Sequence, residues 1–300
     1  TGASDTSAVD AGAVEFNPEA VGTLTVTTLD DEAFDGGSLD DETEDGDGLS
    51  LREAIGLVNS GIEDASTVIE FLDTLSGTIT LGSTIDIARS VSIEGLGEGT
   101  LAIDGGGSVK LFTINGLAGT TEVGFSNLTL QNGEDSGFRA GAINNYSGSL
   151  TVEDVTFTGN DGGRGGAIFN IGEAVTIIDS TFDTNTSDVG GGGAIYTDDA
   201  SYAVDFTIES STFTDNTSTA SGTARGGAIR AKGGTLDITD STFTGSTATA
   251  TGSSGTAFGG AIYGFDAAIA IDGTTFSSSA ARATGTSADG YGGALYMRGG

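Results

Sequence analysis

Residues 165–195 read GGAIFNIGEAVTIIDSTFDTNTSDVGGGGAI, and this segment opens and closes on the same tetrapeptide, Gly-Gly-Ala-Ile. The residues between the two copies form short runs rich in Ile, Val and Thr, which Gly, Asp and Asn separate. That pattern is typical of short strands joined by turns. A unit that recurs with such a period predicts a solenoid, in which each repeat packs on the one before it.

The tetrapeptide or a close variant occurs six times, and a Phe motif lies between successive copies. The alanines are 25, 27, 34, 33 and 33 residues apart, at Ala142, Ala167, Ala194, Ala228, Ala261 and Ala294. The phenylalanines, which we expect to form a structural ladder inside the fold, are Phe157, Phe182, Phe213, Phe243 and Phe276. Repeats of this length match the coils of a parallel β-helix, which stack about 4.8 Å apart and align equivalent residues in columns.

The N-terminal part carries a different signal. Residues 50–53, Ser-Leu-Arg-Glu, are a capping-box sequence, and apolar residues follow at helical spacing as far as Val58. They predict an amphipathic helix from about Leu51 to Asn59, which we expect to cover the exposed first coil. The predicted fold is all-β: a right-handed, single-stranded parallel β-helix with a short N-terminal capping helix. About 25 residues per coil predict roughly nine coils.

These signals divide the chain into three parts. We expect residues 1–21 to be an N-terminal arm or the tail of a preceding module, because residues 7–16 look like the segment that usually closes such a β-helix. Residues 22–65 are predicted to form an acidic loop and the helical cap. Residues 66–300 are predicted to form the β-helix, which is truncated at residue 300 or continues beyond it.

Composition excludes several classes of function. The chain has 43 acidic and 10 basic residues, a net charge of -33, and no Cys or His. Disulfides, thiolate or imidazole zinc sites and His-based catalytic triads are therefore excluded. The charge argues against nucleic acid as a partner, and no apolar run is long enough for this segment to insert into a membrane. Acidic surfaces stay soluble in salt, so we predict an extracellular protein, secreted or at a cell surface.

Two motifs resemble those of known families. Residues 50–55, Ser-Leu-Arg-Glu-Ala-Ile, resemble the Cys-Ser-Leu-Arg-Glu-Ala signature of bacterial and archaeal surface β-helix proteins, with Leu49 in place of the Cys. The Gly-Gly-Ala-Ile and Phe-x-x-Asn motifs are similar to those of chlamydial polymorphic membrane proteins, whose passengers are β-helical adhesins. The resemblance covers about residues 22–300 and implies a surface β-helix. It is specific for the fold and not for the function.

An acidic cluster is the candidate metal site. Ten carboxylates lie between Asp30 and Asp47, and oxygen-rich loops of this kind bind Ca²⁺. Asp41, Asp45 and Asp47 are the candidate ligands, and Ca²⁺ is the one cofactor we expect. The alternative is a solvated linker without metal.

A column of side chains just before the Gly-Ala corners is the candidate ligand site. It comprises Arg139, Arg164, Arg225, Phe258 and Tyr291. Stacked Arg and aromatic side chains bind sugar rings or carboxylates through planar contacts, which makes cell-surface glycans candidate partners. The alternative is that the Arg side chains only neutralise nearby Asp residues.

Two further patterns each permit two interpretations. A row of acids beside the Phe column suits a glycosidase pair, or else caps turns on a soluble face: Glu153, Asp154, Asp179, Glu209, Asp240 and Asp272. Four asparagines lie in glycosylation sequons, or else they bond to the backbone at corners: Asn127, Asn145, Asn185 and Asn216.

The sequence favours a non-enzymatic extracellular surface protein, a structural fibre or adhesin module. No side chain has an ordinary pKa near neutral pH, and the repeat is open-ended. Head-to-tail contacts that do not close grow into filaments, so the expected partners are copies of the chain or further modules of it. The alternatives are a carbohydrate-binding adhesin and a polysaccharide-active β-helix enzyme.

Overall fold

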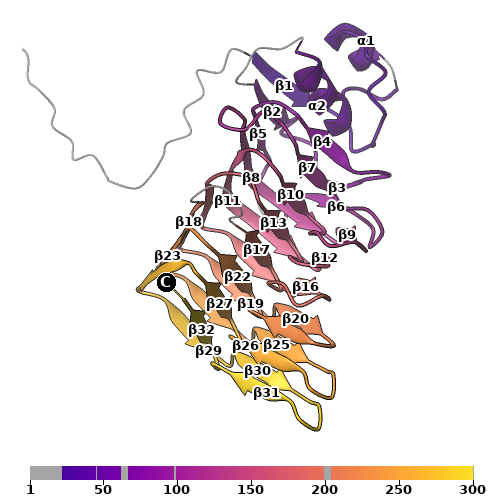
Figure 1. Ribbon diagram of the computed structural model, residues 1–300. Helices are drawn as coiled ribbons and strands as arrows, with labels where there is room; N and C mark the ends of the chain where they lie inside the picture. Colours follow the sequence, from indigo (N-terminus) through magenta and orange to yellow (C-terminus); the bar gives the residue numbers. More distant parts are fainter. Residues whose placement is uncertain (1–21, 45, 62–66, 98, 199–203, 300) are drawn as a thin grey trace, which may run out of the picture.

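The protein is a parallel β-solenoid with a helical cap, as its computed structural model shows (Figure 1). The structure describes residues 22–44, 46–61, 67–97, 99–198 and 204–299. The predicted arm at residues 1–21 lies outside these ranges. Every strand pair in the described ranges is parallel, and none of the helices there has the length and apolar character that a bilayer crossing requires.

Four sheets run along the solenoid, which confirms the all-β fold prediction. Sheet 1 has a main path of β1 (Gly22–Val26), β2 (Thr67–Phe71), β5 (Val91–Glu94), β8 (Glu122–Gln131), β11 (Ser149–Thr158), β14 (Val175–Ile178), β18 (Asp205–Glu209), β23 (Thr235–Thr239) and β28 (Ala268–Asp272). It also includes β3 (Gly77–Thr80), β6 (Leu101–Asp104), β15 (Thr181–Asp183), β19 (Thr212–Thr214), β24 (Thr242–Thr244) and β29 (Thr275–Ser277).

The other three sheets form the remaining sides. Sheet 2 contains β4 (Ile85–Ile87), β7 (Phe112–Ile114), β10 (Ile143–Asn145), β13 (Ile168–Asn170), β17 (Ile195–Asp198), β22 (Ile229–Lys232), β27 (Ile262–Phe265) and β32 (Leu295–Arg298). Sheet 3 contains β9 (Glu134–Asp135), β12 (Asp161–Gly162), β16 (Thr186–Ser187), β20 (Thr217–Ala220), β25 (Thr247–Ala250) and β30 (Ala280–Ala283). Sheet 4 contains β21 (Thr223–Arg225), β26 (Thr256–Phe258) and β31 (Asp289–Tyr291).

The solenoid makes about seven turns, fewer than the nine that the sequence predicts. Two helices and not a coil connect β1 to β2, so the first rung of sheet 1 adds no complete turn. The later repeats are also longer, because they contain the extra strands of sheets 3 and 4. An assumed length of about 25 residues per coil therefore overestimates the number of turns.

The core consists of columns of identical residues. The rings of Phe157, Phe182, Phe213 and Phe243 are fully buried and stack with centroids 4.6, 4.7 and 4.5 Å apart. Phe276 continues the column at 5.0 Å. The small corner residues allow this stacking, because a Cβ on Gly193 would lie only 1.9 Å from the carbonyl oxygen of Gly227 in the next coil.

A second column is polar and equally buried. Asn160, Asn185 and Asn216 are 0% exposed, and each side-chain amide bonds to the next, with both Nδ2–Oδ1 distances at 3.0 Å. Each amide also donates to a backbone carbonyl of the preceding coil, as Asn185 does to Phe157 at 3.0 Å. The Phe-x-x-Asn motif thus supplies both an apolar and a polar ladder.

The cap has two helices, α1 (Leu39–Glu44) and α2 (Leu51–Ser60), at the indigo end of the solenoid (Figure 1). In α2 the capping box is complete: Glu53 N–H donates to Ser50 Oγ at 3.3 Å, and Ser50 N–H donates to Glu53 Oε2 at 2.8 Å. The predicted helix is confirmed and ends one residue later than expected. Helix α1 was not expected, because its acidic residues were interpreted as part of a loop.

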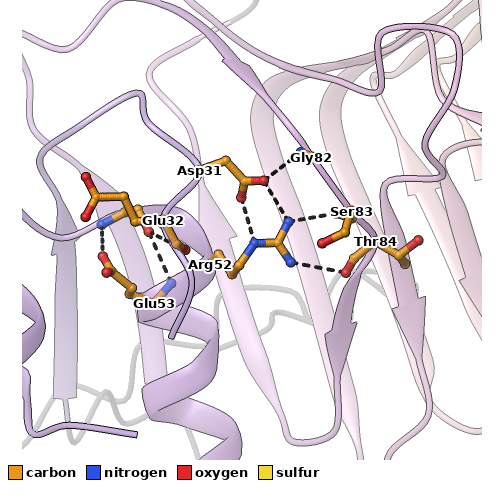
Figure 2. Close-up of polar contacts among 8 residues, drawn as sticks. Asp31, Glu32, Arg52, Glu53, Gly82, Ser83 and Thr84 are labelled. Atoms are coloured by element: carbon orange, nitrogen blue, oxygen red, sulfur yellow. Dashed lines mark hydrogen bonds and ion pairs between the residues drawn. The ribbon is translucent and has the colours of Figure 1, made fainter. Parts of the chain in front are cut away.

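Polar side chains of α2 hold the cap against the edge of sheet 2. Arg52 forms two 2.8 Å contacts with Asp31 and donates to the carbonyls of Ser83 at 2.7 Å and Thr84 at 3.2 Å (Figure 2). Asn59 donates to Asp86 O at 2.7 Å and accepts from Ala88 N–H at 2.8 Å. Because β4 is the terminal strand of sheet 2 in the described chain, these bonds take the place of a neighbouring strand.

Candidate functional site

The candidate ligand-binding residues occupy one column on the outside of the solenoid. Arg225, Phe258 and Tyr291 pair in register in sheet 4. Arg164 N–H donates to Arg139 O at 3.3 Å, so these two lie at adjacent corners. Isolated β-bridges align Ala140, Gly165 and Gly192 on successive rungs. The residues just before them are therefore aligned too, which puts Gly191 on the rung between Arg164 and Arg225. We call this set of six residues the outer column.

An inner column, which the sequence analysis missed, lies beneath it in sheet 2. Register aligns Phe169, Tyr196, Arg230, Tyr263 and Tyr296. Each follows the Ile or Leu of the tetrapeptide, so its side chain points away from the core, since successive side chains of a strand alternate. The signal in the sequence was the aromatic or Arg residue directly after every copy of the tetrapeptide except the first, which Asn144 follows.

Cation–π contacts join the two columns. The Arg139 guanidinium carbon lies 4.8 Å from the Tyr146 ring centre and 5.1 Å from that of Phe169. Arg164 lies 5.6 Å from Tyr196, and Arg225 lies 5.6 Å from Tyr263. Further along, a contact between two aromatic rings replaces the cation–π contacts: the Phe258 ring lies 4.6 Å from the Tyr296 ring, tilted by 48°. We call the two columns together the Arg–aromatic face.

Among the described residues, no ion pair joins an arginine of the outer column to an aspartate, as the alternative interpretation would require. The ion pairs in the described part of the chain join Arg52 to Asp31, Lys110 to Asp135 and Lys232 to Asp198. Arg139, Arg164 and Arg225 take part in none of these and are partly exposed. Partly exposed guanidinium groups over aromatic rings are suited to bind planar or anionic ligands.

Exposed apolar side chains extend the face. Tyr291 is 45% exposed, and Phe138, 5.9 Å from the Arg164 guanidinium, is 64% exposed. Aromatic rings beside partly exposed Arg donors are the combination that contacts both the apolar face and the polar groups of a sugar.

Of the three calcium candidates, the structure describes Asp41 and Asp47. Asp41 is exposed, and its side chain accepts from the Ser38 N–H at 2.9 Å and from Ser38 Oγ at 2.7 Å. These bonds, the backbone one first, lower the pKa of Asp41. Asp47 is exposed, and Asp45 lies outside the described residues. Within those residues no three acidic side chains come together in a way that could hold a metal ion.

The row of acids expected beside the Phe column splits into two columns. Register sets Glu153 between Ser126 and Ile178, so its neighbours in that column are not acidic. Asp154, Asp179 and Asp240 have positive φ values between 47° and 52°, the left-handed conformation that Asp tolerates in turns. A hollow beside Glu94 and Glu153 measures about 100 Å³, well below the 300–1,000 Å³ typical of ligand pockets.

Three of the four sequons are inaccessible. Asn145, Asn185 and Asn216 are 0% exposed and bonded to other amides or to the backbone, and Asn127 is exposed. In the folded chain, Asn145, Asn185 and Asn216 therefore serve as hydrogen-bonding residues of the corners and not as accessible glycosylation sites.

A second acidic group lies in sheet 3, where Glu134 pairs with Asp161 on adjacent rungs. Loss of hydration, followed by repulsion from Asp161, raises the pKa of both Glu134 and Asp188. A carboxyl whose pKa is raised by folding binds its proton more tightly in the folded state.

Stability is therefore expected to fall as the pH rises. The stability that Glu134 contributes is fully present below the pKa that this residue has in the unfolded chain, about 4.5. It is lost as the pH rises through the raised pKa of Glu134 in the folded chain. Melting temperatures measured from pH 4 to pH 8 test this. Glu134→Gln should flatten the profile, whereas Glu122→Gln, which removes an exposed charge on β8, should not. If the melting temperature depends on pH equally in both variants, Glu134 is not the source of the pH dependence.

Comparison with known proteins gives one match. Residues 179–198 and 210–232 match the family model of the Chlamydia polymorphic membrane protein repeat. These segments contain two copies of the tetrapeptide and the residues Phe182 and Phe213. No curated protein and no solved structure matches the chain significantly. The match and the parallel solenoid together fit the resemblance to the chlamydial β-helices.

Proposed function

We propose that this chain is the β-helical binding part of an extracellular surface protein, a non-enzymatic adhesin that holds glycans on its Arg–aromatic face. One observation carries the proposal: Arg139, Arg164 and Arg225 lie over aromatic rings without a carboxylate partner in the described chain. The protein has only 10 basic residues against 43 acidic ones, so three arginines in one column concentrate positive charge on this face.

The arrangement suits an extended sugar chain. Coils stack about 4.8 Å apart, so a linear polymer that runs along the solenoid axis meets a new side chain of the outer column at successive rungs. Guanidinium groups donate in a planar fork to hydroxyls and carboxylates, and exposed rings such as Tyr291 pack on the apolar faces of sugars.

Two observations support an adhesin over a polysaccharide-active enzyme. The partial match to the Chlamydia polymorphic membrane protein repeat joins this chain to a group of surface proteins. Ser126 and Ile178 flank Glu153 in its column, so Glu153 has no carboxylate on the adjacent rungs of that column with which to form a glycosidase pair.

Glycan binding without turnover is the expected result. The purified chain, in 1 M NaCl to screen its charge, should bind a subset of immobilised glycans and release no reducing ends from them. Arg139→Gln and Arg164→Gln should weaken binding about 10-fold or more, as expected for hydrogen bonds to charged groups. Arg282→Gln, at an exposed position of β30 outside the face, is the matched control. Release of reducing ends, or equal binding by all three variants, would contradict the proposal.

Assembly and calcium binding stay predictions. Head-to-tail filaments, with copies of this chain or further modules as partners, would be visible by negative-stain microscopy as rods that lengthen with protein concentration. Ca²⁺ at Asp41, Asp45 and Asp47 would raise the melting temperature over that in a chelator.

A further inference from the structure

The outer column lacks a side chain at one rung. Gly191 occupies this rung between Arg164 and Arg225, because a Cβ there would collide with the backbone of Arg164. Each outer arginine lies over the inner residue of the following coil, as Arg164 does over Tyr196 and Arg225 over Tyr263. By that pattern, Gly191 leaves Arg230 without an outer side chain over it. Two guanidinium groups lie near the Tyr196 ring: Arg164 at 5.6 Å and Arg230 at 4.9 Å.

Arg230 replaces an aromatic residue in the inner column. Register puts it between Tyr196 and Tyr263, both of which are buried. Its Nε is buried and has no hydrogen-bond partner in the described part of the protein, and its Nη1 donates to Gly190 O at a long 3.5 Å. A buried donor on a charged group is costly to leave unpaired, and such groups in native structures usually face an ion or solvent.

Positive charge gathers at this point. Burial lowers the pKa of Arg230, and the nearby charge of Arg225 lowers it further, although arginine keeps its proton at neutral pH. The carboxylate next to this group, Asp198, is already engaged by Lys232 at 2.6 Å and by the Tyr196 hydroxyl at 2.8 Å. Burial alone would raise the pKa of Asp198, but the hydrogen bonds from Lys232 and Tyr196, together with the charges of Lys232 and Arg230, lower it.

We propose that Arg164, Arg225 and Arg230 form an anion-binding subsite around Gly191, and that it takes the carboxylate of an acidic sugar. The uronate ligand class rests on the proposed glycan-binding function, whereas the subsite itself rests on the three guanidinium groups. A guanidinium donates two parallel hydrogen bonds to a carboxylate, and Arg230 Nε is one such donor without a partner. The exposed ring of Tyr291 lies further along the outer column, where a neighbouring sugar can pack.

A comparison of three probes tests the inference on the intact chain in 1 M NaCl: a galacturonate trimer, its neutral methyl ester, and inorganic sulfate. Titrations are followed by calorimetry and by the Nε–H resonances of ¹⁵N-labelled arginines. We expect the acid to bind at least about 10-fold more tightly than the ester, as for one hydrogen bond to a charged group. The resonance of Arg230 should shift with both acid and sulfate.

Variants identify the residues responsible. Arg230→Gln should lose the preference for acid over ester, and Arg230→Lys should recover it only in part, because an ammonium cannot form the planar fork. Arg282→Gln should behave as the unmodified chain. Should Arg230→Gln fail to fold, the resonance shift in the unmodified chain still decides the question.

The outcomes separate the two proposals. Equal binding of acid and ester, with no shift of the Arg230 resonance, would overturn the subsite and leave the glycan-binding function standing. If no glycan binds in either assay, the proposed function and the uronate ligand class fall. In that case a sulfate-induced shift of Arg230 would still support the anion subsite, and its absence would overturn that too.

Discussion

Replacing Phe213 by Ala is expected to lower the free energy of unfolding by about 3–5 kcal/mol, the usual cost of deleting a buried aromatic ring. The Phe213 ring is 0% exposed and stacks on Phe182 at 4.7 Å and on Phe243 at 4.5 Å. Its removal deletes two stacking contacts and leaves a cavity that the rigid coils above and below cannot fill. Urea denaturation followed by circular dichroism measures the loss.

Phe276→Ala is the matched control for this prediction. Phe276 is only partly buried and stacks on Phe243 at 5.0 Å, with no second ring beyond it in the described chain. We expect a loss of roughly half that of Phe213→Ala, since burial and stacking are both reduced. Equal losses at the two positions would show that the column does not act as a continuous ladder.

Asn185→Ala is expected to destabilise the chain by a similar amount, about 3–5 kcal/mol, although it removes no apolar surface. Asn185 accepts from the N–H and the side-chain amide of Asn160, at 3.1 and 3.0 Å, and donates to Phe157 O and Asn216 Oδ1. The substitution removes the partner of the Asn160 N–H and the amide that donates to Phe157 O, whereas Asn160 Nδ2 keeps its bond to Leu130 O and Asn216 Oδ1 keeps its bond from the Asn185 N–H. Each buried unpaired group costs about 1–3 kcal/mol.

The same denaturation experiment checks this prediction. Asn185→Ser provides the comparison, because a serine takes the equivalent place in a later coil at Ser246. The Ser246 hydroxyl is buried and has no hydrogen-bond partner in the described residues, so a serine at position 185 should not replace the amide, and the loss should be similar to that of Asn185→Ala. A loss below about 1 kcal/mol for Asn185→Ala would contradict the ladder as a source of stability. Mass spectrometry of the folded chain should also find Asn185 without a glycan.

Local patterns predicted several elements correctly for identifiable reasons. Helix α2 follows from the capping box at Ser50 and Glu53 and from apolar residues at helical spacing, all within one short segment. The parallel solenoid follows from the constant order of tetrapeptide and Phe motif, because stacking on hydrogen-bonded rungs requires equivalent residues to align. The number of turns was wrong because the strands of sheets 3 and 4 lengthen the later coils.

Other features depend on contacts that no local pattern contains. The capping helix was expected, but the role of Arg52 was not, since its partners Asp31, Ser83 and Thr84 are far from it in the chain. The unexpected helix α1 comes from a segment of acidic residues, whose charge alone suggested a solvated loop. Its acids lie in the first helical turn, where the helix dipole favours negative charge.

The sequence by itself determined the solenoid, its Phe column and its cap. The first two follow from a motif that recurs in every coil, and the cap follows from a capping box and helical spacing within one short segment. Only the tertiary structure decided which residues of different coils face each other. Insertions of unequal length separate Arg164 from Arg225 and Tyr196 from Arg230 in the chain, and the hydrogen-bond register between coils brings them together. The Arg–aromatic face is therefore a property of that register, since a shift by one residue would turn its side chains to the opposite side of the sheet.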